Sequence, residues 1–147
     1  MKRMKNKQQG SFVLEALIAI LLFAIGILAI VGLQAASIAN SASSKYRTDA
    51  SLLANQVIAQ MWVADKTNAT LVTDFCGPAA SGVCAAPGAN YQAWANAVMQ
   101  VLPGASSVAA APSIVIDASN VATITVFWQT AKDNAPHNYS TIVNIND

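Results

Sequence analysis

The stretch KQQGSFVLEALIAILLFAIG, residues 7–26, joins a basic segment to a long apolar one. The apolar run continues to residue 33, and its 18 residues from position 16 onward contain no charged or strongly polar side chain. At about 1.5 Å per residue such a run forms a helix about 27 Å long, close to the thickness of a bilayer's hydrocarbon core. The stretch therefore predicts a helix that crosses a membrane.

The positive charges of the chain gather in front of this run. Lys2, Arg3, Lys5 and Lys7 lie within the first ten residues, whereas the remainder holds four basic against seven acidic residues, a net charge of −3. Basic segments beside a membrane span stay in the cytoplasm. We therefore expect one crossing, with the domain outside. The overall charge of +1 gives no reason to expect direct binding of nucleic acid.

Glu15 is an unusual residue at the edge of an apolar run, and three interpretations compete. In the first, residues 1 to about 40 are a cleaved signal peptide, with small-residue sites near Ala39 to Ser43. In the second, the run is a plain signal anchor, which leaves Glu15 unexplained. In the third, the chain is cut between Gly10 and Ser11, before the apolar run. Glu15 then lies about one helical turn into the mature chain, where its carboxylate could pair with the freed amine of its own or a neighbouring subunit.

The segment GSFVLEALIAILLFAIGILAIVGLQ, residues 10–34, resembles the processing signature of type IV pilins. Their precursors have a short basic leader, a Gly, five residues ending in Glu, and about twenty apolar residues. The resemblance implies that prepilin peptidase cleaves between Gly10 and Ser11 in the inner membrane and that the new amine of Ser11 is methylated. It also implies that Glu15 acts in assembly. Mature pilins usually begin with Phe, whereas here Ser11 precedes Phe12.

Beyond the membrane run, apolar residues continue at helical spacing. No Pro precedes Pro78, which predicts one helix from about Phe12 to Ala64, roughly 80 Å long. Its second half carries an apolar stripe that should cover a globular domain. The stripe consists of Tyr46, Ala50, Leu53, Ala54, Val57, Ile58, Met61 and Trp62.

The rest of the chain predicts loop, helix and sheet in that order. Residues 65–90 have the composition of a loop, and Asn90 is expected to cap a helix that carries Tyr91, Trp94, Val98 and Leu102 on one face and stops at Pro103–Gly104. The segments SIVID, VATITVFWQT and NYSTIVNI alternate as strands, and SSVAA is a weaker strand candidate. We expect an α+β fold, in which a long N-terminal helix packs on a small antiparallel sheet.

Cys76 and Cys84 lie close together in the predicted loop. Export to an oxidising compartment favours a disulfide between them, which would contribute about 2–3 kcal/mol by the chain-entropy model. Two free thiols are the alternative.

We find no pattern in the sequence that indicates catalysis, a metal or another cofactor. His137 is the single histidine and is expected to be solvated, so no zinc ligand set is predicted. The aspartates at 65, 74, 117, 133 and 147 are expected to act as caps and surface charges, and Trp62, Trp94 and Trp128 to lie in the core. The chain is therefore not expected to be an enzyme.

Later segments extend the resemblance to one subgroup. GLQ (32–34), YRTDASLLANQVIAQM (46–61), AWANAVMQVLPG (93–104) and ATITVFWQ (122–129) are similar to minor pilins of the PilV type, the type IV pilus modification proteins. This implies a minor pilin that co-assembles with other minor and major pilins to initiate or modify the pilus, with downstream roles in adhesion, twitching motility or DNA uptake. A type II secretion pseudopilin and a signal-anchored periplasmic binding module are the alternatives.

These expectations divide the chain into three parts. Residues 1–10 are a basic leader, residues 11–34 a transmembrane and assembly helix, and residues 35–147 a periplasmic pilin-like domain that includes the second half of the long helix. The protein is expected in the inner membrane, surrounded by lipid, before assembly and in the extracellular pilus afterwards.

Overall fold

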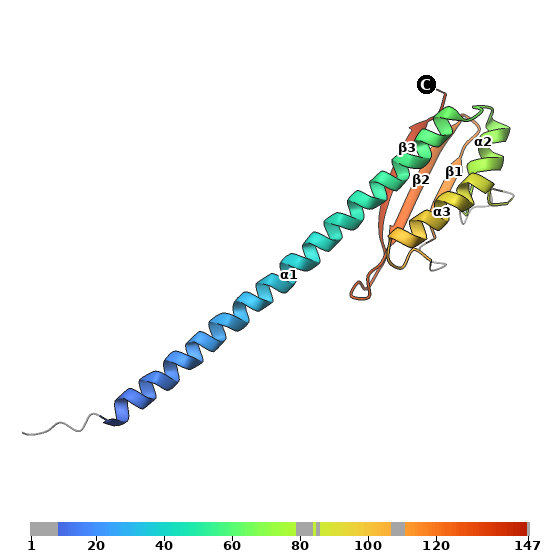
Figure 1. Ribbon diagram of the computed structural model, residues 1–147. Helices are drawn as coiled ribbons and strands as arrows, with labels where there is room; N and C mark the ends of the chain where they lie inside the picture. Colours follow the sequence, from blue (N-terminus) through green and yellow to red (C-terminus); the bar gives the residue numbers. More distant parts are fainter. Residues whose placement is uncertain (1–8, 79–83, 85, 107–110, 147) are drawn as a thin grey trace, which may run out of the picture. The chain divides into compact units, whose positions relative to one another are not determined.

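The computed structural model describes residues 9–78, 84, 86–106 and 111–146. Within these residues three helices are followed by three strands, and Figure 1 labels them. In chain order they are α1 (Gln9–Val63), α2 (Asn68–Phe75), α3 (Ala89–Val101), β1 (Ser113–Ile116), β2 (Val121–Trp128) and β3 (His137–Asn144). A long apolar N-terminal helix followed by a small antiparallel sheet confirms the predicted α+β class.

The chain divides after Ala42 into two compact units, and α1 contributes residues to both. The first unit contains the described residues up to Ala42. Every side chain from Phe12 to Ser41 is exposed in it. Gly26 and Gly32 have open space where a Cβ would stand. A helix that is hydrophobic on all sides is a helix that lipid or other protein chains surround.

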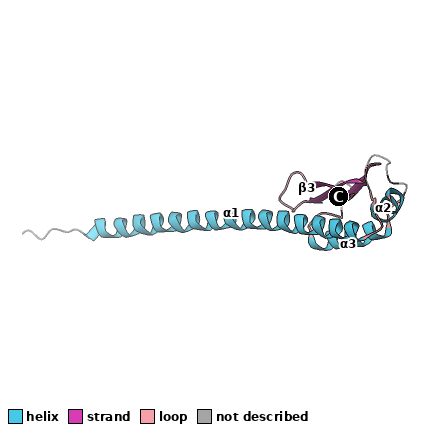
Figure 2. Ribbon diagram, turned by 90° about the horizontal axis from the view of Figure 1, so that it is seen from above, coloured by secondary structure: helices cyan, strands magenta, loops and turns pink. Residues whose placement is uncertain are grey.

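The second unit has two layers, a helical layer and a sheet. Figure 2 shows the end of α1 beside α3 in the helical layer, with the strands on the other side. The predicted stripe on α1 is confirmed from Ala50 to Met61, and Tyr46 packs against its edge. The buried residues of the stripe are Ala50, Leu53, Ala54, Val57, Ile58 and Met61.

Trp62 departs from the predicted stripe, because 51% of its surface is exposed. Each step of four residues turns the direction of a side chain by about 40° around an α-helix. Ala54 and Ile58 still point into the core, but the next step carries Trp62 past its edge. The prediction that Trp62 lies in the core was therefore wrong.

The sheet has the order β1-β2-β3 and is antiparallel throughout. Ile114 lies opposite Ile124, which lies opposite Thr141. Along β2 the side chains alternate between buried and half-buried, so Ile124, Val126 and Trp128 face the helices as predicted. The inward residues of β3 are only partly buried.

Helix α2 was not predicted, since residues 65–90 were expected to be loop. Its Leu71 and Phe75 are buried in the same core as α1 and α3. The two side chains are four residues apart, so they lie on one face of the helix. The eight residues of α2 have modest helix propensity, and burial of this face outweighs it.

Helix α3 carries the predicted buried face, but its cap is Gly88 rather than Asn90. The carbonyl of Gly88 accepts the N–H of Gln92 at 2.9 Å. A Cβ on Gly88 would collide with the backbone of Asp74, so α2 leaves room only for glycine. The strand candidate SSVAA falls mostly on residues 107–110, which lie outside the described residues.

Asn120 closes the end of the domain where β1 turns into β2. It is buried and has a φ of 60°. Its Oδ1 accepts the Nδ2–H of Asn68 at 2.7 Å, and its Nδ2 donates to the Lys66 carbonyl at 2.9 Å and to Asn146 Oδ1 at 2.8 Å. One side chain therefore ties the start of α2, the β1–β2 turn and the end of the chain together.

The two edges of the sheet differ. Gly77, shortly after α2, pairs with Ile114 of β1 through two backbone hydrogen bonds of 3.1 and 3.2 Å and so covers that edge at Ile114. Strand β3 forms the opposite edge, and no described segment pairs with its outer side.

Candidate functional site

The largest exposed apolar surface of the described chain is the first part of α1. Phe12, Phe23 and Leu33 are 75%, 70% and 73% exposed. Among the described residues, α1 is the one helix long and apolar enough to cross a membrane, and its most apolar window has a mean hydropathy of 3.0. We call the surface of residues 12–33 the apolar helix surface.

Glu15 is the one charged side chain between residues 9 and 44. It is exposed among Leu14, Ile18, Ala19 and Leu22. It makes no hydrogen bond or ion pair with any described residue. Burying an unpaired carboxylate in hydrocarbon costs about 2.5 kcal/mol or more of free energy. A cationic or hydrogen-bonding partner would therefore stabilise Glu15 in that environment.

Gly10 and Ser11 lie in the first turn of α1, which begins at Gln9. Cleavage between them would place the new amine four residues before Glu15, about 6 Å along the helix axis. That separation places the amine and the carboxylate on neighbouring turns, so they could pair within one chain or between adjacent helices. Processing and methylation at Ser11 stay predictions.

The predicted disulfide between Cys76 and Cys84 is present, with the two Cα atoms 5.6 Å apart. Cys76 is fully buried directly after α2, and its carbonyl accepts the N–H of Gly88 at 2.9 Å. The disulfide therefore fastens the α2–α3 connection beside the segment that covers β1. Its position indicates a structural role.

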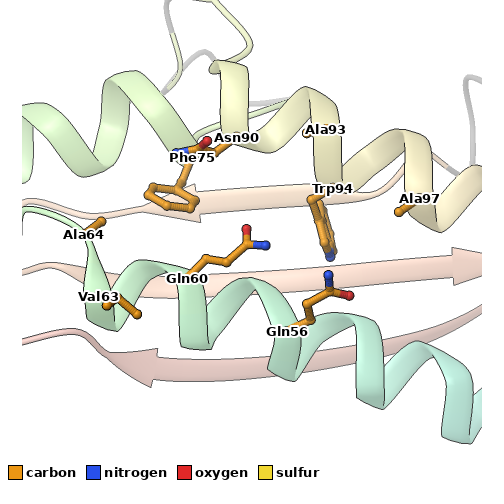
Figure 3. A pocket seen from close by; sticks show the side chains of 9 residues that line it. All are labelled: Gln56, Gln60, Val63, Ala64, Phe75, Asn90, Ala93, Trp94 and Ala97. Atoms are coloured by element: carbon orange, nitrogen blue, oxygen red, sulfur yellow. The ribbon is translucent and has the colours of Figure 1, made fainter.

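A groove of about 490 Å³ lies between α1 and α3, as Figure 3 shows. Its floor holds the rings of Phe75 and Trp94, and the amides of Gln56, Gln60 and Asn90 stand at its rim. Val63, Ala64, Ala93 and Ala97 complete the lining. None of these nine side chains carries an ionisable group, so the groove offers packing and amide hydrogen bonds rather than acid–base chemistry.

Sequence reasoning missed this groove, although the sequence carries a signal for it. Residues 50–64 and 75–116 contain no Asp, Glu, Lys, Arg or His. A surface helix normally carries charges on its outer face, so two adjacent helices without them indicate a surface that is suited to contact protein.

His137 and Asp133 meet at the base of the β2–β3 loop. His137 Nε2 lies 3.5 Å from Asp133 Oδ1, and half of the His137 side chain is exposed. The ring stacks on Trp128 at a centroid distance of 5.8 Å. Hydrogen bonds from the backbone N–H and hydroxyl of Thr130 lower the pKa of the Asp133 carboxyl, with a smaller contribution from His137. The arrangement orders a turn, and the described residues contain no cluster of three metal-ligating side chains.

Three buried aromatic side chains, Trp94, Trp128 and Tyr91, have structural positions. Trp94 and Trp128 are buried, as predicted. The Tyr91 hydroxyl donates to the Pro112 carbonyl at 2.6 Å, and burial raises the pKa of Tyr91 to about 12. This phenol therefore stays protonated near neutral pH.

Comparison with known proteins adds no assignment to this geometry. No family model matches the chain, and neither a curated protein nor a solved structure matches it.

Proposed function

We propose that the chain is a minor type IV pilin, a structural subunit that prepilin peptidase processes and that co-assembles with other pilins to initiate or modify a pilus. Before assembly the apolar helix surface lies in the inner membrane, with the second unit in the periplasm. After assembly the subunit is part of the extracellular fibre. The proposal assigns the chain no catalytic activity and no cofactor.

The observation that carries the proposal is one carboxylate, Glu15, without a partner among the described residues, in a stretch (residues 12–33) whose other side chains are all apolar. A plain anchor gains nothing from this residue, because a carboxylate at the membrane edge disfavours insertion. A helix that leaves lipid for other helices gains a directional contact, because Glu15 can pair with the amine at Ser11 of a neighbour. The pair fixes the stagger between two helices that apolar contacts alone would leave free to slide.

The test of this proposal is the mass of the full chain, expressed with and without a prepilin peptidase. We expect the enzyme to remove residues 1–10 and leave Ser11 at the new terminus. Gly10→Leu keeps the apolar run intact but replaces the small residue at the cut, so it should stay unprocessed.

Two results would contradict the proposal. A mass that is unchanged by the peptidase would indicate a plain anchor. A cut near Ala39 would remove the apolar helix surface and indicate an ordinary exported protein.

A further inference from the structure

The outer edge of β3 has no partner strand among the described residues. Two hydrogen bonds establish which backbone groups point outward there. The N–H of Asp117 donates to the Val121 carbonyl at 3.0 Å, and the N–H of Ile145 donates to the Asn120 carbonyl at 3.0 Å. The first bond extends the β1–β2 ladder by one pair beyond Ile116–Ala122. The second bond extends the β2–β3 ladder by one pair beyond Val121–Asn144.

Bonded and non-bonded pairs alternate along an antiparallel ladder. Counting back from Ile145, the residues Val143, Thr141 and Tyr139 direct their N–H and C=O groups toward β2. The same alternation follows from β2. Starting at Val121, its odd-numbered residues hydrogen-bond to β1 and its even-numbered residues hydrogen-bond to β3. Asn138, Ser140 and Ile142 therefore direct their N–H and C=O groups away from the sheet.

The β3 edge lacks the features that usually prevent strands from pairing. Natural edge strands carry Lys, Pro or a bulge, or a neighbouring segment covers them. Residues 138–144 contain no Pro and no Lys, Arg, Asp or Glu, and the pairing of β2 with β3 runs through eight consecutive residue pairs without a bulge. Gly77 covers the β1 edge at Ile114, whereas no described segment pairs with the β3 edge.

The inward side chains of β3 are also less buried than those of β1 and β2. The inward residues of β1 and β2 are at most 4% exposed, whereas Tyr139, Thr141 and Val143 are only partly buried. On the outer face Ile142 is 69% exposed. A further strand beside β3 would cover both sets of side chains.

A charge next to this edge indicates what the further strand carries. Arg47 is exposed and shares a shallow hollow of about 430 Å³ with Tyr139. Arg47 makes no ion pair with a described residue. A carboxylate in the hollow would neutralise it.

We propose that β3 accepts an extended strand from a neighbouring pilin subunit. The strand is uncharged where it passes Asn138 to Ile142, and it carries a carboxylate at the end that reaches Arg47. The identity of the partner as a pilin rests on the proposed function. The strand addition itself rests on the edge geometry, since main-chain hydrogen bonds supply the affinity in this mode of recognition.

The experiment measures amide hydrogen exchange of the labelled full chain. The chain is expressed in its host alone and together with the host's other pilin subunits. Co-assembly should slow exchange of the Asn138, Ser140 and Ile142 amides by at least about tenfold, because a strand hydrogen bond must open before its amide exchanges. The Tyr139 and Thr141 amides already bond to β2 and should change little. Contact by side chains alone would not produce this alternation.

Matched variants at one residue test the same point. Ser140→Pro removes an outward N–H and should abolish the added protection, while the chain still folds because edge strands tolerate proline. Ser140→Ala keeps the N–H and should retain the protection. Circular dichroism checks folding of both variants, and should Ser140→Pro not fold, Ile142→Lys replaces it. Arg47→Gln should weaken co-assembly, and an unchanged yield would remove the carboxylate from the proposal.

Three other outcomes distinguish failure of the strand addition from failure of the proposed function. Loss of residues 1–10 without alternating protection overturns the strand addition and leaves the proposed function standing. Protection in the chain expressed alone assigns the strand to a second copy and overturns the choice of partner. Retention of residues 1–10 contradicts the proposed function, independently of the edge.

Discussion

The indole nitrogen of Trp94 donates a 2.8 Å hydrogen bond to the Leu53 carbonyl oxygen, in the buried contact between α3 and α1. This carbonyl lies within α1, so it accepts from another helix in addition to its own helical ladder. The bond joins α3 to α1 beside the groove that Trp94 lines.

Trp94→Phe should lower the free energy of unfolding by about 1–2 kcal/mol, because a buried hydrogen bond is lost while the ring is largely replaced. Urea unfolding of the full chain in detergent, followed by circular dichroism, measures this. Trp62→Phe is the control, since the half-exposed Trp62 should change stability by less than about 0.5 kcal/mol. Equal losses for the two variants would contradict the assignment.

Asn120 combines a positive φ with three hydrogen bonds, and two substitutions separate these contributions. Asn120→Gly should cost the hydrogen bonds alone, about 1–3 kcal/mol. Asn120→Ala should cost about 1–2 kcal/mol more, because a Cβ strains the left-handed conformation. Should the two variants unfold at the same urea concentration, the backbone conformation would not be a constraint at this turn.

Tyr91 should make stability fall at alkaline pH. Its folded pKa of about 12 lies above the usual value of 10, so its contribution is fully present below pH 10 and is lost as pH rises toward 12. Unfolding free energies between pH 8 and about 12 should show this decline. Tyr91→Phe should remove Tyr91's part of the slope and lower stability at neutral pH by about 1–2 kcal/mol, because the Pro112 carbonyl loses its donor. An unchanged alkaline slope in the variant would assign the decline to other groups.

The disulfide should contribute about 2–3 kcal/mol to the free energy of unfolding. The double variant Cys76→Ala/Cys84→Ala should lose this amount and become insensitive to reductant. Wild-type protein in reductant should match it in urea unfolding. A variant as stable as the oxidised wild type would show that the Gly77 and Gly88 backbone contacts hold the segment alone.

Glu15→Ala should leave membrane insertion and cleavage intact, because the apolar run and Gly10 remain. Incorporation into fibres with partner subunits should fall, as measured by the amount of the chain in sheared pili. Glu15→Gln keeps the size and removes the charge, so it separates pairing from packing. Wild-type incorporation of both variants would contradict the pairing of Glu15 with an amine.

The sequence predicted the parts of the fold that periodicity controls. Stripes at three and four residues located α1 and α3, and alternation in β2 and β3 located the sheet and its inward face. The close spacing of Cys76 and Cys84, together with the expectation of export, predicted the disulfide. These features depend on local pattern, which a single sequence displays.

Features that depend on distant neighbours were not predictable. Helix α2 forms because its Leu71 and Phe75 meet a core built by other elements, and Gly88 is a cap because the backbone of Asp74 lies against it. The groove and the open edge of β3 require knowledge of which elements lie side by side. Glu15 was recognisable because a charge in an apolar run stands out without any tertiary information.

The described sheet pairs with Gly77 at Ile114 on one side and has no partner strand beside β3 on the other, so a further strand can add at β3. Among the described residues, each copy has one open strand edge, at β3, while Gly77 already occupies the β1 edge at Ile114, so successive copies have no second open edge through which to continue. Joining of copies through the described sheet therefore ends after a single step and produces a pair rather than a continuous ribbon.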